Sequence, residues 1–138
     1  LSLIEAQSHF SLWCMFDATL VATNDVRQHD VDIERILLNP ETIAINQDDF
    51  DASSLAKLTT SRDGETWSRP LANGDIAVLV LNRKGVVMRT GFDWSSLPGV
   101  ARGEAGVRFR VRDLQGFDWK DILDFYFKDL DFESVQNL

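Results

Sequence analysis

The pattern of hydrophobic and polar positions along this chain changes near residue 50. Before that point the sequence predicts helices on either side of one buried strand, and beyond it short strand-like runs are separated by turn residues. Ser2 and Glu5 have the spacing of a capping box, in which a hydroxyl and a carboxylate accept hydrogen bonds from the backbone of the first turn. This spacing predicts a helix after Ser2, and the apolar residues 12–16 indicate that its second half is buried on most sides.

A strand and a second helix are expected next. Residues 18–23 form a β-prone run without alternation, which is typical of a strand covered on both faces in a parallel sheet. A helix is predicted from about Asp30, and Pro40 ends it and opens a short helical or extended piece at 41–46. Helix, buried strand and helix make a fragment of α/β architecture, and such a strand needs parallel neighbours that this sequence does not offer.

The second half of the chain predicts antiparallel β-structure. Residues 65–71 and 76–82 have the pattern of two hairpin strands, because the Asn-Gly pair at 73–74 tolerates the positive φ angles of a tight turn. Further strands are expected at 86–94 and 107–112, and short strands with frequent turns favour a sandwich or a barrel.

Composition excludes several classes of protein. The 138 residues are 44% hydrophobic and 26% charged, as in an ordinary globular domain, and no apolar run has the length of a membrane helix. The net charge of −8 disfavours binding to nucleic acid. Cys14 is the only cysteine, so no internal disulfide forms, and no Cys/His cluster predicts a zinc site. We therefore expect no nucleic-acid partner, no membrane partner, no metal and no cofactor.

Several motifs taken in order resemble the α-galactosidase (melibiase) family of glycoside hydrolases. In the first half they are EAQSHFSLW at 5–13, NDVR at 24–27, ILLN at 36–39 and IAINQD at 43–48. In the second half they are GETWSRPLANGDIAVLVLNR at 64–83, FDW at 92–94 and VRDL at 111–114. Each motif is moderate evidence, and their shared order makes the resemblance strong.

The resemblance implies a fold in two parts. Residues 1–50 would be the last helix–strand–helix piece of a (β/α)₈ TIM barrel, and residues 51–138 a C-terminal antiparallel β-sandwich. The tail diverges from the family from about residue 115, where apolar positions at helical spacing predict an amphipathic helix at 118–130.

The resemblance also implies an activity. Family enzymes release terminal α-linked galactose by a retaining double displacement that uses two aspartates, one as nucleophile and one as acid and then base. Both aspartates belong to barrel strands upstream of the segment that matches this chain, so no residue here receives a catalytic, cofactor-binding or metal-binding role. The expected partner is a galactose-containing oligosaccharide or glycoconjugate, bound through the missing barrel, and the expected location is secreted or lysosomal. The chain alone is predicted to be inactive, and its oligomeric state is not predicted.

Two other functions stay open at this point. The β domain could bind carbohydrate or protein without any chemistry, with Trp67 or Trp94 stacking on a sugar ring. Alternatively, the chain could be a subunit that completes a barrel supplied by another polypeptide. Tryptophans in sandwich strands are more often part of the core, and we interpret both residues in that way.

Other polar residues are interpreted as structural. His9 is expected to pack on Trp13, and Asn24 and Asp25 to form a turn or a helix cap. Asp17 differs from the family pattern, and at the junction of a buried helix and a strand its carboxylate would need a paired cation or several hydrogen bonds. The remaining charged groups are expected to be solvated surface: Asp48, Asp49 and Asp51; Asp129, Asp131 and Glu133; and the arginine row Arg108, Arg110 and Arg112.

Overall fold

The computed structural model describes part of the chain and divides it into two compact units. The described residues are 1–22, 25, 27, 30–49, 51–60, 64–86, 92, 94–99 and 110–114. The units are Leu1–Val100 and Ala101–Leu138, and all helices and strands described below belong to the first unit. The elements are α1 Leu3–Met15, α2 Val31–Leu37, α3 Pro40–Asn46, η1 Ala52–Ser54, β1 Ala56–Thr60, β2 Gly64–Pro70, β3 Ile76–Asn82 and η2 Trp94–Ser96.

The three α-helices begin where the sequence predicts, because each has a side chain that caps its first turn. At α1 the capping box is present: the Ser2 hydroxyl accepts from the Glu5 amide at 3.3 Å, and the Glu5 carboxylate accepts from the Ser2 amide at 2.7 Å. Asp30 caps α2 through the amides of the next turn. Asn39 caps α3 in the same way, and Pro40 occupies its first turn, so this piece is helical.

The end of α1 corrects two expectations. Asp17 is exposed and has a φ of 55°, the left-handed conformation that closes a helix, and the Ala18 amide donates to the Trp13 carbonyl at 2.9 Å. Its carboxylate is therefore not buried and needs no paired cation. Residues 18–22 form no strand, although a strand was expected at 18–23. A β-prone run forms a strand only when a neighbouring strand accepts its hydrogen bonds, and no partner is described for it.

The described strands form an antiparallel sheet in the order β1-β2-β3. The predicted hairpin is confirmed, with Gly64 opposite Asn82 at one end and Pro70 opposite Ile76 at the other. Gly74 in its turn has a φ of 91°, which glycine adopts without strain. Strand β1 was not anticipated, and its register shifts between Lys57 and Thr59.

The later predicted elements fall mainly outside the described residues. Of the strand expected at 86–94, Val86 and Phe92 are described and lie in no strand, and Trp94 begins the short helix η2. Residues 110–112 also lie in no strand, whereas 107–109 and the helix expected at 118–130 lie outside the described residues.

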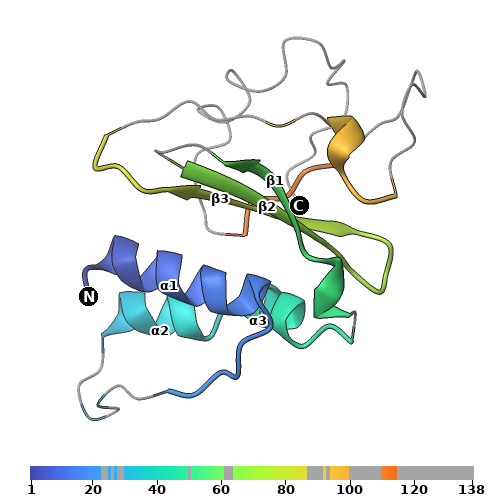
Figure 1. The fold of residues 1–138 in the computed structure, drawn as a ribbon. Coiled ribbons are helices and arrows are strands. Elements are labelled where there is room, and N and C mark those ends of the chain that lie inside the picture. The colour runs from blue at the N-terminus through green and yellow to red at the C-terminus, as the bar shows by residue number, and fades with distance from the viewer. Residues whose placement is uncertain are drawn as a thin grey trace. The chain divides into compact units, whose positions relative to one another are not determined.

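The helices pack on one side of the sheet, with α1 against α2, α3 and β3 (Figure 1). Among the residues that the structure describes, the buried apolar side chains are Phe10, Cys14, Met15, Ala77 and Leu97. None of the helices in the described part of the chain has the length and the apolar content that crossing a bilayer requires.

Strand β2 is buried along both faces although it is largely polar. Thr66, Ser68 and Arg69 are fully buried, and Glu65 is 9% exposed. Side chains alternate between the two faces of a strand, so both faces of this central strand are covered. The buried polar side chains of β2 are therefore the place in this sheet where specific hydrogen bonds and ion pairs are expected.

Candidate functional site

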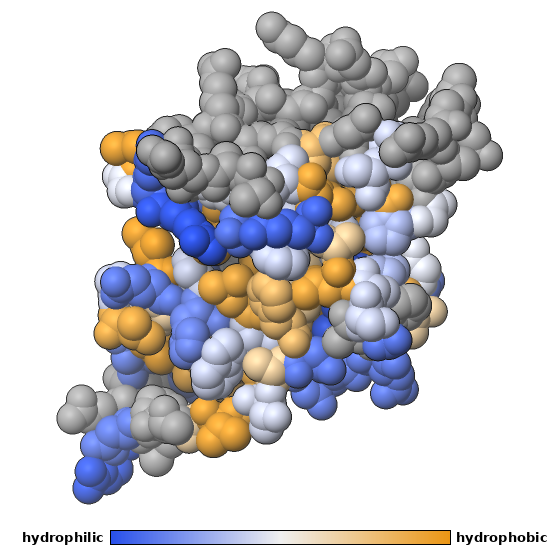
Figure 2. Space-filling view, viewed as in Figure 1, coloured by the Kyte–Doolittle hydropathy of each residue, from blue (hydrophilic) through white to orange (hydrophobic). Residues whose placement is uncertain are grey.

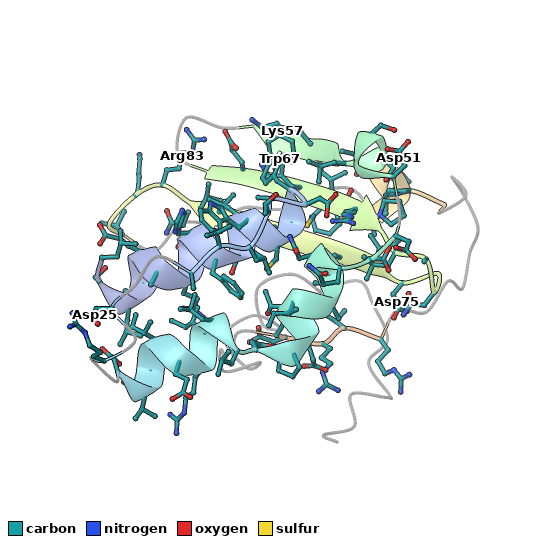
Figure 3. All side chains as sticks on the ribbon, turned by 90° about the horizontal axis from the view of Figure 1, so that it is seen from below. Asp25, Asp51, Lys57, Trp67, Asp75 and Arg83 are labelled. Carbon is teal, nitrogen blue, oxygen red and sulfur yellow. The ribbon has the colours of Figure 1, made fainter. Side chains whose placement is uncertain are left out.

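A charged cluster crosses the three strands at the start of β2. We call it the Glu65 cluster, and it consists of Lys57 on β1, Glu65 and Trp67 on β2, and Arg83 just after β3. Glu65 Oε1 lies 2.9 Å from Lys57 Nζ and 2.8 Å from Arg83 Nη2, and Glu65 Oε2 accepts from the Trp67 indole N–H at 3.0 Å. Figure 3 shows Lys57 and Trp67 next to each other, with Arg83 on the same edge.

The surroundings of Glu65 keep its carboxylate ionised. The hydrogen bond from Lys57 lowers its pKa below the ordinary 4.5, helped by the Trp67 N–H and by the positive charge of Arg83. An ionised carboxylate with these donors on both oxygens acts as an acceptor and not as a general acid. The cluster therefore ties the strands together, and its carboxylate holds no proton to donate.

Trp67 is engaged on its ring as well as on its nitrogen. Lys57 Nζ lies 4.7 Å from the ring centroid, and the Phe16 ring meets the indole edge to face at 4.9 Å. Trp67 is half-buried, and these contacts agree with its interpretation as a packing residue instead of a sugar platform. The side chain of Trp94 lies outside the described part of the chain.

A second polar arrangement joins the end of the helical segment to the hairpin. We call it the Asp48–Arg69 junction. Arg69 Nη2 donates to the backbone carbonyl of Asp48 at 3.0 Å, and the Asp48 carboxylate accepts from the Ala72 amide at 3.1 and 3.2 Å. Within the described residues, the Nε and Nη1 atoms of Arg69 have no hydrogen-bond partner. Asp48 was expected to be solvated surface, and it is half-buried, with its carboxylate bound to a backbone amide across the junction.

The end of α3 is also fixed by a buried polar side chain. Asn46 is 4% exposed, and its Nδ2 donates to the carbonyls of Ala18 at 2.9 Å and Trp13 at 3.3 Å. This amide holds the segment after α1 against α3. Asn46 therefore fixes backbone carbonyls that a neighbouring strand would bind in a sheet.

The remaining acidic candidates are separate from one another. Figure 3 places Asp25, Asp51 and Asp75 at different positions. Asp25 is exposed and paired with Arg27 at 2.8 Å, and this partner lowers the pKa of its carboxyl. Asp51 accepts from the amide and the hydroxyl of Ser53, which lower its pKa.

Several predicted positions are exposed or lie outside the described residues. Asp49, Arg110 and Arg112 are exposed, in agreement with a surface role. The residues that fall outside the described part of the chain are Asn24, Arg108, Asp129, Asp131 and Glu133.

The other candidates from the sequence act in packing. The His9 ring meets the Trp13 ring edge to face at 4.5 Å, as predicted, although His9 itself is exposed. Burial raises the pKa of the Cys14 thiol to about 11, so it is protonated at neutral pH and is a poor nucleophile. Among the described residues, no group of three or more His, Cys, Asp or Glu side chains is arranged to hold a metal ion.

Sequence reasoning missed the residues that organise the polar core. Glu65 and Arg69 were included in a predicted strand. Every second residue of a strand lies on the same face, so these two residues share a face with Trp67, and this was a signal that charge would be buried there. Lys57 was missed together with β1, and Asn46 carries no local signal because both of its acceptors belong to a distant segment.

Residues 61–115 match the family described as the alpha galactosidase C-terminal beta sandwich domain. This range contains β2, β3 and the Glu65 cluster apart from Lys57.

Individual relatives extend the similarity along the chain. Alpha-galactosidase A of Cellvibrio japonicus is 36% identical over 118 residues, which cover 86% of this chain and 28% of that protein. Alpha-galactosidase of Cyamopsis tetragonoloba is 32% identical over 99 residues, covering 72% of this chain and 24% of that protein. This chain thus spans about a quarter of the length of these relatives.

Solved structures show the same similarity. A crystal structure from Bacteroides fragilis, described as an alpha-galactosidase, superimposes with a TM-score of 0.53 at 39% identity. The match covers 60% of this chain and 18% of that chain.

Proposed function

Because this chain carries the C-terminal part of an α-galactosidase family protein, we propose that it is the non-catalytic portion of a glycoside hydrolase that releases terminal α-linked galactose. The observation that carries the proposal is the alignment with the Cellvibrio enzyme, whose 118 residues extend well beyond the 61–115 domain match. Its substrate would be a galactose-containing oligosaccharide or glycoconjugate.

We further propose that residues 1–50 are the end of a (β/α)₈ barrel and that residues 51–138 are the sandwich domain. Support comes from the helical segment, where Val21, Val31 and Leu38 are 57%, 55% and 61% exposed. Figure 2 shows hydrophobic surface interspersed with hydrophilic surface on one face of the molecule. Barrel helices and strands bury such side chains against neighbouring repeats, so these positions would be covered in a longer protein.

The proposed mechanism is a retaining double displacement whose two catalytic aspartates lie upstream of this chain. The engagement of Glu65, Asp48 and Asp51 in ion pairs and backbone hydrogen bonds supports this assignment, since each of these carboxylates already has a structural partner. In this arrangement the Glu65 cluster ties the strands together, and the Asp48–Arg69 junction joins them to the helical segment, while the barrel performs the reaction.

The direct test is an activity assay on the pure 138-residue chain with a chromogenic α-galactoside. We expect no turnover above the buffer rate, and the intact Cellvibrio enzyme serves as the positive control. Robust turnover by the chain alone would overturn the assignment of the catalytic aspartates to an upstream segment.

A complementation assay tests the family function itself. The chain would be fused to the upstream three quarters of the Cellvibrio enzyme in place of that enzyme's own C-terminal part. We expect the chimaera to hydrolyse the α-galactoside, with the same upstream part alone as the control. A folded chimaera without activity would contradict the proposal. A saturable heat when the isolated chain is titrated with galactose-containing oligosaccharides would favour a binding module instead.

A further inference from the structure

The turn between β2 and β3 contains a reactive pair that the proposed function does not use. Asn73 and Gly74 are exposed, and the space where a side chain would stand on Gly74 is open. We propose that Asn73 is a site of deamidation by water, and that the folded turn controls the rate of this reaction. The proposal is independent of the glycosidase assignment.

The chemistry needs only the chain and solvent water. The backbone nitrogen of Gly74 attacks Cγ of Asn73, so that an N–Cγ bond forms, the Cγ–Nδ2 bond breaks and ammonia leaves with the proton from the Gly74 nitrogen. Water then opens the cyclic imide at one of its two carbonyls and gives aspartate or isoaspartate at position 73. Glycine as the following residue favours the attack, because it has no side chain to hinder the approach of its nitrogen.

The folded turn holds both reacting groups away from this path. The Gly74 amide donates to the Leu71 carbonyl at 2.9 Å. Asn73 Oδ1 accepts from the Asp75 amide at 2.9 Å, and its Nδ2 donates to Asp75 Oδ2 at 2.9 Å. The imide can form only when these hydrogen bonds open, so the reaction rate follows the population of the opened turn.

Deamidation would in turn weaken the hairpin. The new carboxylate at position 73 has no N–H to donate, and it would stand against the carboxylate of Asp75 at hydrogen-bond distance. Two negative charges in this position repel each other, and isoaspartate also adds a carbon to the backbone of the turn. The modification therefore acts in one direction, from a closed turn to a looser one.

The rate test uses the full chain at mildly alkaline pH, with peptide mapping by mass spectrometry in native buffer and in denaturing urea. Asn82 is a matched internal control, because it is exposed and its Oδ1 accepts from the Lys84 amide at 2.8 Å, but Arg83 follows it. We expect conversion at Asn73 and not at Asn82, and at least about tenfold faster conversion in urea. Equal rates in the two conditions, or no conversion at Asn73 in either, would overturn the proposal.

The charge consequence is tested with two variants. Asn73→Asp should lower the urea midpoint of the chain relative to the wild type, because it places two carboxylates together. Adding Asp75→Asn exchanges donor and acceptor between the two positions and should recover most of this loss. A double variant no more stable than Asn73→Asp would contradict the predicted repulsion.

Discussion

Asn46 offers a direct test of how the helical segment is held together. Its buried amide donates to the carbonyl of Trp13 in the last turn of α1 and to the carbonyl of Ala18 just after this helix. Asn46→Ala removes the side-chain amide that makes both hydrogen bonds. Among the described residues no other group donates to the Ala18 carbonyl, so this carbonyl loses its hydrogen bond. We expect the variant to fold but to lose the restraint on residues 18–22.

The magnitude follows from the two distances and from burial. A hydrogen bond contributes about 1 kcal/mol net, and a buried carbonyl left unpaired costs about 1–3 kcal/mol. The 2.9 Å bond to Ala18 should contribute most and the 3.3 Å bond to Trp13 less. Alanine returns up to about 0.7 kcal/mol through its higher helix propensity. The expected loss is about 2 kcal/mol in the free energy of unfolding, or a fall in Tm of about 8 °C for a chain of this size.

Urea unfolding followed by tryptophan fluorescence measures this loss, provided that the m-value is unchanged. Gln47→Ala is the matched control, because Gln47 is exposed and only its contact with Asn46 is removed; its loss should stay below about 1 kcal/mol. Asn46→Asp keeps the size but opposes a carboxylate to two carbonyls, so it should be the most destabilised. An Asn46→Ala variant within about 0.5 kcal/mol of the wild type would refute the reasoning.

Two further predictions concern ionisable groups. Glu65 has a lowered pKa in the folded state, so its stabilising ion pairs with Lys57 and Arg83 are complete above about pH 4.5 and are lost as the pH falls through the lower folded value. The stability difference between the wild type and Glu65→Gln should therefore shrink on acidification in urea titrations, and a difference independent of pH would argue against it. Cys14, whose pKa is raised to about 11, should react with a thiol reagent far more slowly in native buffer than in urea, whereas similar rates would mean that the thiol is not buried.

Local sequence signals predicted the ends of elements well. The Ser2 and Glu5 capping box, the Asp30 cap and the Asn-Gly turn at 73–74 each satisfy their hydrogen bonds within a few residues. Such signals depend on near neighbours along the chain, so they can be recognised without knowledge of the fold. The hairpin and the first two helices follow from them, whereas the piece at 41–46 was expected to be either helical or extended.

The features that the sequence did not reveal depend on distant partners. Residues 18–22 have the composition of a strand but are fixed through the Asn46 amide, and no local pattern indicates that contact. Strand β1 was missed because its run from Ala56 alternates weakly and its register shifts at Lys57. The burial of Arg69 depends on the carbonyl of Asp48, which approaches only when the helical segment and the hairpin are already folded.

The edge-to-face contact between Phe16 and Trp67 has a consequence for biosynthesis. A ribosome releases the N-terminal segment first, so α1 and Phe16 leave the exit tunnel well before the strand that covers them has been made. During that interval the apolar side of α1 has no sheet to pack on. Nascent chains halted before residue 67 should therefore recruit chaperones that bind exposed apolar helices, and chains long enough to bring β3 out of the exit tunnel should release them.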